Sequence, residues 1–147
     1  MNARDAILVV EDEPDALTLL QHAFAAAGIT HPLHAVHDGE NALAYLRGEG
    51  VYADRAVYPS PSLLLLDLKI PGSSGFEVLE SIRREPSFAA LPVVILTSSR
   101  ERRDVQRAYA AGANSYLVKP SSLKRLTEMA RAFRDYWLVH NEGPPMS

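Results

Sequence analysis

The stretch "LLLLDLKIPGSSG" (63–75) decides the fold of this chain. Its four consecutive leucines predict a strand that is buried on both faces, as in a parallel sheet. The run ends in Asp67, and a turn rich in proline and glycine follows. A carboxylate placed directly after so apolar a strand needs a chemical explanation, which the other strand ends supply.

Size and composition describe one compact domain. The chain has 147 residues, of which 47% are hydrophobic and 22% charged, with a net charge of −3 and no cysteine. We expect a single domain over 1–147, with its core at about 5–138 and a tail at 139–147. No apolar run reaches the roughly 20 residues of a membrane span, so we expect a cytoplasmic protein without membrane contact. The mildly basic C-terminal helix lacks the pattern of a nucleic-acid reader, so no direct nucleic-acid binding is expected.

Apolar runs and helical periodicity alternate along the rest of the chain. Besides 63–67, strands are predicted at 6–10, 33–36, 91–99 and 115–120. Helices are predicted between and after these strands: from Pro14 to a stop at Gly28, after an Asp38 cap, over 75–85, over 100–113, and after a Ser121 or Ser122 cap. Residues 48–62 have no period and predict a long surface loop.

This alternation predicts an α/β fold. Five βα units form a parallel sheet with helices on both faces, and right-handed crossovers leave few ways to wind it. In such sheets, ligands bind beyond the carboxyl ends of the strands. The residues at those ends are Glu11, Asp12, Asp67, Thr97 and Lys119.

Three carboxylates at one rim repel one another unless a cation intervenes. A hard divalent ion such as Mg²⁺ suits a few carboxylates plus water, and Lys119 adds a second positive charge. One carboxylate can then act as a nucleophile toward a phosphoryl group whose charge Lys119 and the Thr97 hydroxyl help to neutralise. Taken singly, an acid at a strand end is more often a helix cap and a threonine more often a turn former, but the combination favours phosphoryl transfer.

With these residues in this order, the chain resembles the receiver domain of bacterial two-component response regulators over roughly residues 5–138. The acid pair Glu11 and Asp12, "LLLLDLKIPGSSGFEVL" with Asp67, the threonine of "ILTSS" and the lysine of "YLVKP" carry the resemblance. It implies the flavodoxin-like winding with strand order 2-1-3-4-5. It also implies that Asp67 accepts a phosphoryl group from the histidine of a sensor kinase. It also implies that Asp12, Asp67 and the main-chain carbonyl of Lys69 hold Mg²⁺, with Glu11 acting partly through water, and that Thr97 and Lys119 bind the phosphoryl oxygens.

The resemblance implies further roles near the rim. Tyr116 matches an aromatic switch position that moves inward when Thr97 is drawn to the phosphate; the alternative is an ordinary half-buried strand aromatic. The Lys119–Pro120 bond is expected to be cis. Lys69 stands two residues after the phosphoacceptor, where the family varies, so the phosphate lifetime is left open.

Two features indicate partners. The long loop at 48–62 and the segment "FRDYWLVHNEGPP" resemble single-domain regulators that pair with phytochrome-type histidine kinases. Since no effector domain is recognised, we expect the output to be a change of partner or dimer contact. The expected surface lies on the fourth helix, fifth strand and fifth helix, with Val105, Tyr109, Phe133 and Trp137; Trp137 as a plain core cap is an equal alternative.

Three other functions fit part of this pattern. A flavin-binding protein of the same winding needs a glycine- and hydroxyl-rich loop after its first strand, where this chain has the phosphate-repelling "EDEPD". A hydrolase with an aspartyl-phosphate intermediate usually has its nucleophile on the first strand, whereas Asp67 follows the third. A degenerate receiver that never accepts phosphate is the mildest alternative, although all five rim residues are present.

Overall fold

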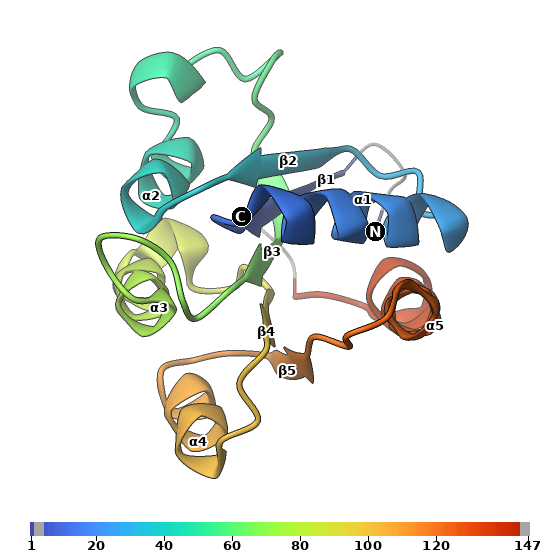
Figure 1. Ribbon diagram of the computed structural model, residues 1–147. Coiled ribbons are helices and arrows are strands. Elements are labelled where there is room, and N and C mark those ends of the chain that lie inside the picture. The colour runs from blue at the N-terminus through green and yellow to red at the C-terminus, as the bar shows by residue number, and fades with distance from the viewer. Residues whose placement is uncertain (2–4, 145–147) are drawn as a thin grey trace.

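The computed structural model describes residue 1 and residues 5–144. Strands and helices alternate through this part of the chain, with three short helical segments added to them (Figure 1). In chain order the elements are β1 (Ala6–Val10), α1 (Pro14–Ala26), β2 (Leu33–Val36), α2 (Gly39–Arg47), η1 (Gly50–Tyr52), β3 (Pro61–Leu66), α3 (Gly75–Arg84), η2 (Pro86–Phe88), β4 (Val93–Thr97), α4 (Arg102–Ala110), β5 (Ser115–Val118), α5 (Leu123–Phe133) and η3 (Arg134–His140).

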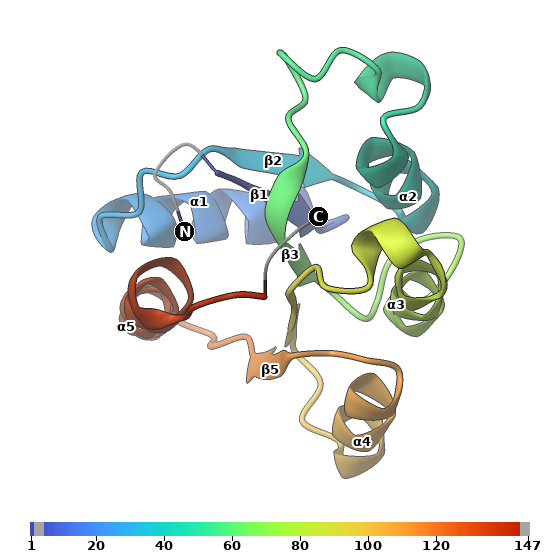
Figure 2. The same ribbon diagram turned by 180° about the vertical axis from the view of Figure 1, so that it is seen from behind.

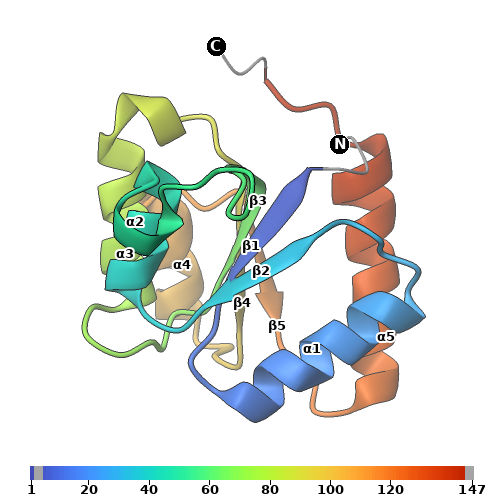
Figure 3. The same ribbon diagram turned by 90° about the horizontal axis from the view of Figure 1, so that it is seen from above.

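The strands form one parallel sheet in the order β2-β1-β3-β4-β5, which confirms the predicted fold class and strand order. Helices α1 and α5 cover one face of the sheet, and α2, α3 and α4 cover the other (Figures 2 and 3). The winding direction changes between β1 and β3, so the carboxyl ends of these two strands flank the place where such sheets bind ligands.

Alternation along each central strand divides the core into two layers. In β3, Leu64 and Leu66 belong to the layer under α2, α3 and α4, whereas Leu63 and Leu65 belong to the layer under α1 and α5. Successive strand side chains point to opposite faces, so a run of four leucines supplies both layers at once. All four are at most 2% exposed, which gives β3 a rigid position at the centre of the molecule.

The segment at 48–62 is more ordered than its sequence predicted. It contains the short helix η1, and β3 begins at Pro61, two residues earlier than predicted. Its aromatic rings pack against Tyr45 of α2, with ring centroids 5.1 Å away for Tyr52 and 5.9 Å away for Tyr58. The guanidinium of Arg55 donates to the carbonyls of Tyr45 and Leu46, which closes the C-terminal end of α2.

The C-terminal helix departs from the prediction at its end. Ser122, one of the two predicted caps, accepts from the main-chain N–H of Arg125 at 3.2 Å. After Phe133 the chain continues in π-helical form as η3. No helix within the described residues is long and apolar enough to cross a bilayer.

Candidate functional site

The carboxyl ends of four strands bring their polar residues to one rim, with Asp67 at its centre. Directly after β3, the Asp67 side chain is buried and accepts three hydrogen bonds. Its Oδ1 accepts from the Thr97 hydroxyl at 2.9 Å and from the main-chain N–H of Lys69 at 3.1 Å, and its Oδ2 accepts from Lys119 Nζ at 2.7 Å. The carboxylate is therefore oriented by donors from three segments of the chain.

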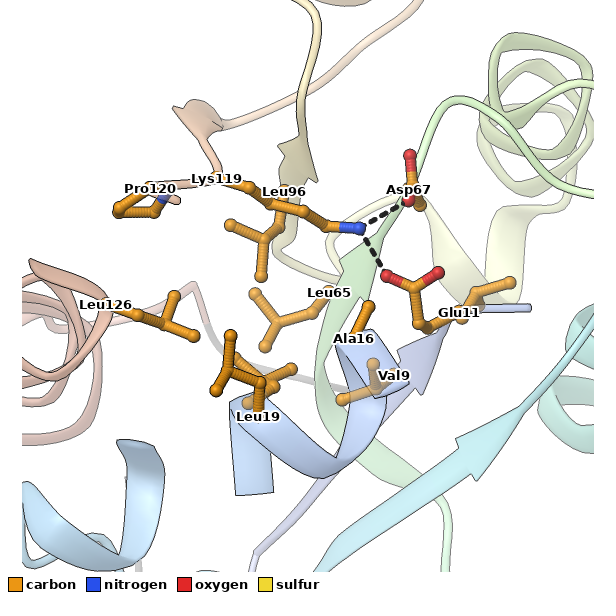
Figure 4. A pocket seen from close by; sticks show the side chains of 12 residues that line it. Val9, Glu11, Ala16, Leu19, Leu65, Asp67, Leu96, Lys119, Pro120 and Leu126 are labelled. Atoms are coloured by element: carbon orange, nitrogen blue, oxygen red, sulfur yellow. Dashed lines mark hydrogen bonds and ion pairs between the residues drawn. The ribbon is translucent and has the colours of Figure 1, made fainter. Parts of the chain in front are cut away.

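Lys119 bridges two acids from different strands (Figure 4). Its ammonium pairs with Oδ2 of Asp67 and with Oε1 of Glu11, the residue that follows β1. The other oxygen of Glu11, Oε2, accepts from the main-chain N–H of Glu13 at 3.2 Å. One cation thus keeps two nearly buried carboxylates close together, as the sequence predicted.

The electrostatics of this pair follow from burial. Burial raises the pKa of Glu11 above 4.5, against the opposing effect of Lys119. Burial alone would lower the pKa of Lys119, but its hydrogen bonds and charge interactions with Asp67 and Glu11 outweigh that effect and raise the pKa above 10.5. The lysine is therefore charged at neutral pH and provides a fixed positive charge beside Asp67.

Gly75, the first residue of α3, allows this helix to approach the turn after Asp67. A Cβ at Gly75 would lie 2.4 Å from the carbonyl oxygen of Asp67 and 2.7 Å from Cα of Leu68. The main-chain N–H of Gly75 donates to the Leu68 carbonyl at 2.9 Å, and Ser74 caps the helix. The glycine-rich turn noted in the sequence therefore has a packing reason as well as a conformational one.

The rim also contains oxygen donors that suit a hard divalent cation. Asp12 follows Glu11 and is half-buried, and the main chain of Lys69 lies against Asp67. Within the described ranges, no three acidic or histidine side chains already form a metal cluster. Two carboxylates and a carbonyl still fit Mg²⁺, which keeps several waters and seldom uses a cage made only of protein ligands.

A family model for the response regulator receiver domain matches residues 7–131. The chain belongs to this family. It is a receiver of two-component signal transduction, which confirms the resemblance drawn from the rim residues.

Individual relatives of this receiver are similar over most of their length. The probable methanogenesis regulatory protein FilR2 of Methanothrix harundinacea is 40% identical, over 94% of this chain and 86% of FilR2. Response regulator Rcp1 of Synechocystis is 37% identical, over 93% of this chain and 91% of Rcp1.

Solved structures of related response regulators are also similar to this receiver. That of the phosphorylated cyanobacterial phytochrome response regulator RcpA has a TM-score of 0.87 and 34% identity, covering 97% of this chain and 99% of RcpA. That of the Mn²⁺-bound form of Rcp1 has a TM-score of 0.84 and 36% identity, covering 96% of this chain and 99% of Rcp1.

Tyr116 of the receiver lies on β5 and is half-buried. Its hydroxyl donates to the main-chain carbonyl of Ser99, in the segment between β4 and α4, at 2.9 Å. The Thr97 hydroxyl points at Asp67 in the same structure. The chain from Thr97 to Ser99 therefore links the rim to Tyr116.

The expected cis bond before Pro120 is wrong, because the described residues contain no cis peptide. The main-chain N–H of Lys119 donates to the Thr97 carbonyl at 2.8 Å, which continues the pairing of β5 with β4 by one residue. With this backbone, the ammonium reaches Asp67 and Glu11 without a cis bond.

The expected contact surface needs one correction. Phe133 is 4% exposed and its ring stacks on Phe24 of α1 at 5.6 Å, so it belongs to the core and cannot meet a partner. Trp137 is half-buried and packs against the same core layer, which favours its alternative role as a core cap. Tyr109 is 50% exposed and Val105 is half-buried, so these two remain available on α4.

Sequence reasoning missed the contribution of Arg83 to the fold, at the edge of the sheet opposite the rim. Its guanidinium donates to the carbonyls of Leu91 and Gly112 and to Oδ1 of Asn114, so it ties the end of α3 to the segments before β4 and β5. From the sequence alone, an arginine in the last turn of a helix is expected to be exposed to solvent. No local signal separated Arg83 from its neighbour Arg84, which is exposed.

Proposed function

We propose that Asp67 of this receiver accepts a phosphoryl group from the histidine of a sensor kinase. An oxygen of the Asp67 carboxylate attacks phosphorus, the P–N bond to the histidine breaks, and an acyl phosphate forms while the imidazole nitrogen keeps the electron pair. The observation that carries the proposal is the convergence of Thr97, Lys119 and the Lys69 N–H on one buried carboxylate.

These same donors fit the charge that develops during transfer. Lys119 and the Thr97 hydroxyl already lie within hydrogen-bond distance of Asp67, and they bind the phosphoryl oxygens after transfer. We assign no activity on other substrates; the protein catalyses only its own phosphorylation and slow dephosphorylation. It acts as a signalling protein in the cytoplasm.

Asp12, Asp67 and the main-chain carbonyl of Lys69 would hold the metal ion, which we propose to be Mg²⁺, with Glu11 acting partly through water. When bound, Mg²⁺ supplies positive charge against the phosphoryl oxygens. A Mn²⁺-bound form is known for Rcp1, which is 36% identical, and this supports divalent-cation binding by the present receiver.

Intact-mass measurement with a small phosphodonor and Mg²⁺ tests the acceptor. Wild type gains one phosphoryl group, Asp67→Asn gains none, and the matched change Asp54→Asn in an exposed loop leaves labelling unchanged. No gain on the wild type defeats the proposal, whereas equal labelling of Asp67→Asn places the phosphate elsewhere.

For the kinase, we propose a bacterial phytochrome-type histidine kinase. The similarity to RcpA, whose structure is described as that of a phytochrome response regulator, supports this pairing over 97% of the chain. Phosphate transfer from a phosphorylated phytochrome kinase should be faster than from a histidine kinase of another sensor class. Equal rates from both would remove the phytochrome assignment and leave phosphorylation of Asp67 intact.

We propose as output a homodimer through the surface of α4, β5 and η3. Tyr109 and Tyr136 expose 50% and 55% of their area, and both belong to the elements around edge strand β5. An aromatic surface beside an edge strand suits a second copy. Gel filtration should give a dimer for wild type and a monomer for Tyr109→Ala combined with Tyr136→Ala; an unchanged dimer removes this interface. Tyr109→Phe combined with Tyr136→Phe is the control that retains both rings.

A further inference from the structure

An apolar cavity of about 130 Å³ lies directly beneath the ion pairs of the rim. It is enclosed by the sheet on one side and by α1 and α5 on the other (Figure 4). Its walls are aliphatic: Val9, Leu65 and Leu96 from the strands, Ala16 and Leu19 from α1, and Leu126 from α5.

The polar end of the cavity is formed by the bridging lysine and its two acids. Glu11, Asp67 and Lys119 all line it, and the Lys119 stem runs along its upper wall before the ammonium reaches the carboxylates. Two carboxylates against one ammonium give this end a formal charge of −1. The cavity is therefore apolar at its base and anionic at its mouth.

We propose that this cavity is a binding site for a small primary amine that carries one aromatic ring or an aliphatic group of similar size. The apolar group occupies the space between α1 and α5, and the ammonium contacts the Glu11 carboxylate at the mouth. This binding differs from phosphoryl acceptance in its ligand and needs neither a phosphodonor nor a metal ion, but its mouth shares Glu11, Asp67 and Lys119 with the phosphoacceptor site.

The size of the cavity limits the apolar group that the ligand can carry. Dry cavities of about 150 Å³ that are lined by aliphatic and aromatic side chains bind benzene. A single ring thus matches this space, whereas a fused ring system exceeds it. Burial of the ring supplies affinity through the apolar area removed from water.

The charge of the mouth selects the head group. An ammonium meets a net negative charge and two acceptor groups, an alcohol meets the same acceptors without attraction between charges, and a carboxylate meets repulsion from Glu11 and Asp67. The expected order of affinity is amine, then alcohol, then carboxylate, for ligands with the same ring.

The test is an NMR titration of ¹⁵N-labelled full-length protein in buffer free of divalent metal. Benzylamine, benzyl alcohol and benzoate serve as probes with one ring and three head groups. Benzylamine should give saturable chemical-shift changes of the amides in β1, α1 and the segment after β5. Among the three probes, benzoate should bind with the lowest affinity. Absence of saturable shifts with benzylamine, or tighter binding of benzoate, would overturn the proposal.

Two matched variants locate the ligand. Ala16→Leu fills the cavity and should weaken benzylamine binding by about tenfold or more, which corresponds to the loss of roughly two buried methylene groups. Ala25→Leu adds the same side chain at an exposed position of the same helix and should leave the titration unchanged. Equal weakening by both variants, or by neither, places the ligand outside the cavity and contradicts the proposal.

A third variant tests the head group. Glu11→Gln should reduce the preference for benzylamine over benzyl alcohol, while binding of the alcohol stays within about a factor of two. A preference that survives this change shows that the amine does not contact Glu11. Because the titration of the wild type uses neither phosphodonor nor metal ion, saturable benzylamine binding with no phosphorylation of Asp67, or the reverse, separates this proposal from the assignment of the phosphoacceptor.

Discussion

Lys119 Nζ lies 2.7 Å from Oδ2 of Asp67, although 52 positions separate the two residues in the chain. The same ammonium pairs with Glu11, which is 108 positions away. A lysine that is charged and oriented before any phosphodonor arrives needs no reorganisation when the transition state forms.

Replacement of Lys119 by methionine should therefore slow phosphorylation while keeping the aliphatic stem. We expect the rate with a small phosphodonor and Mg²⁺ to fall by about 100-fold, the typical loss when one preorganised donor is removed. Intact-mass time courses measure it. Lys124→Met, an exposed change on α5, is the control, and a rate equal to that of the control would contradict the role given to Lys119.

Gly75→Ala should destabilise the fold and disturb the rim together. The added Cβ would meet main-chain atoms of Asp67 and Leu68 at 2.4 and 2.7 Å, and backbone cannot move aside as a flexible side chain can. We expect a loss of about 2 kcal/mol or more in the free energy of unfolding, measured with urea. Gly143→Ala, whose Cβ meets nothing within 4 Å, is the matched control. Equal stability of the two variants would show that α3 can shift without cost.

Arg83→Met should destabilise the protein more than Arg84→Met does. Arg83 donates to four carbonyls and to Oδ1 of Asn114, and its removal leaves several of these acceptors without a donor. A loss of about 2 kcal/mol or more is expected in urea unfolding. Arg84 is exposed, so its change should cost at most about 0.5 kcal/mol. A similar cost for both would assign Arg83 to the surface.

Because Tyr45 is buried, we expect the free energy of unfolding to depend on pH in the alkaline range. Burial raises its pKa above 10.0, since the folded state disfavours the phenolate. The unfolded chain therefore releases this proton first, and the contribution of Tyr45 to stability, complete below pH 10.0, is lost as the pH rises through the folded pKa. Urea unfolding at neutral pH and above pH 10.0 should show a smaller decline for Tyr45→Phe than for wild type.

Tyr45→Phe should also destabilise the protein at neutral pH. The Tyr45 hydroxyl donates to the Pro59 carbonyl at 3.0 Å, so its removal should cost about 1 kcal/mol. Tyr136→Phe, at an exposed position, controls for the loss of a tyrosine hydroxyl. An identical pH decline for wild type and Tyr45→Phe would mean that the phenolate is accommodated in the fold.

Local patterns were enough to predict the parallel sheet. The four leucines of β3 are buried on both faces, and right-handed crossovers between the strands leave few possible windings. The strand ends followed from that winding, so Glu11, Asp67, Thr97 and Lys119 could be assigned to one rim from the sequence.

The loop at 48–62 and the last helix could not be predicted in the same way. The loop lacks periodicity, and its order comes from Arg55 and from tyrosines that meet Tyr45 across the chain. Phe133 was predicted to lie on the contact surface. Only the position of Phe24 on a neighbouring helix made it a core residue.

The sequence by itself determined the alternation of elements and the chemical types at the strand ends, because periodicity and residue type act over a few neighbouring positions. The tertiary structure alone decided that one ammonium joins Glu11 to Asp67 and that a cavity remains below them. The bridge depends on how the strands are ordered in the sheet, and the cavity depends on how helices α1 and α5 pack on it. Distances between segments far apart in the chain are not encoded in any local pattern.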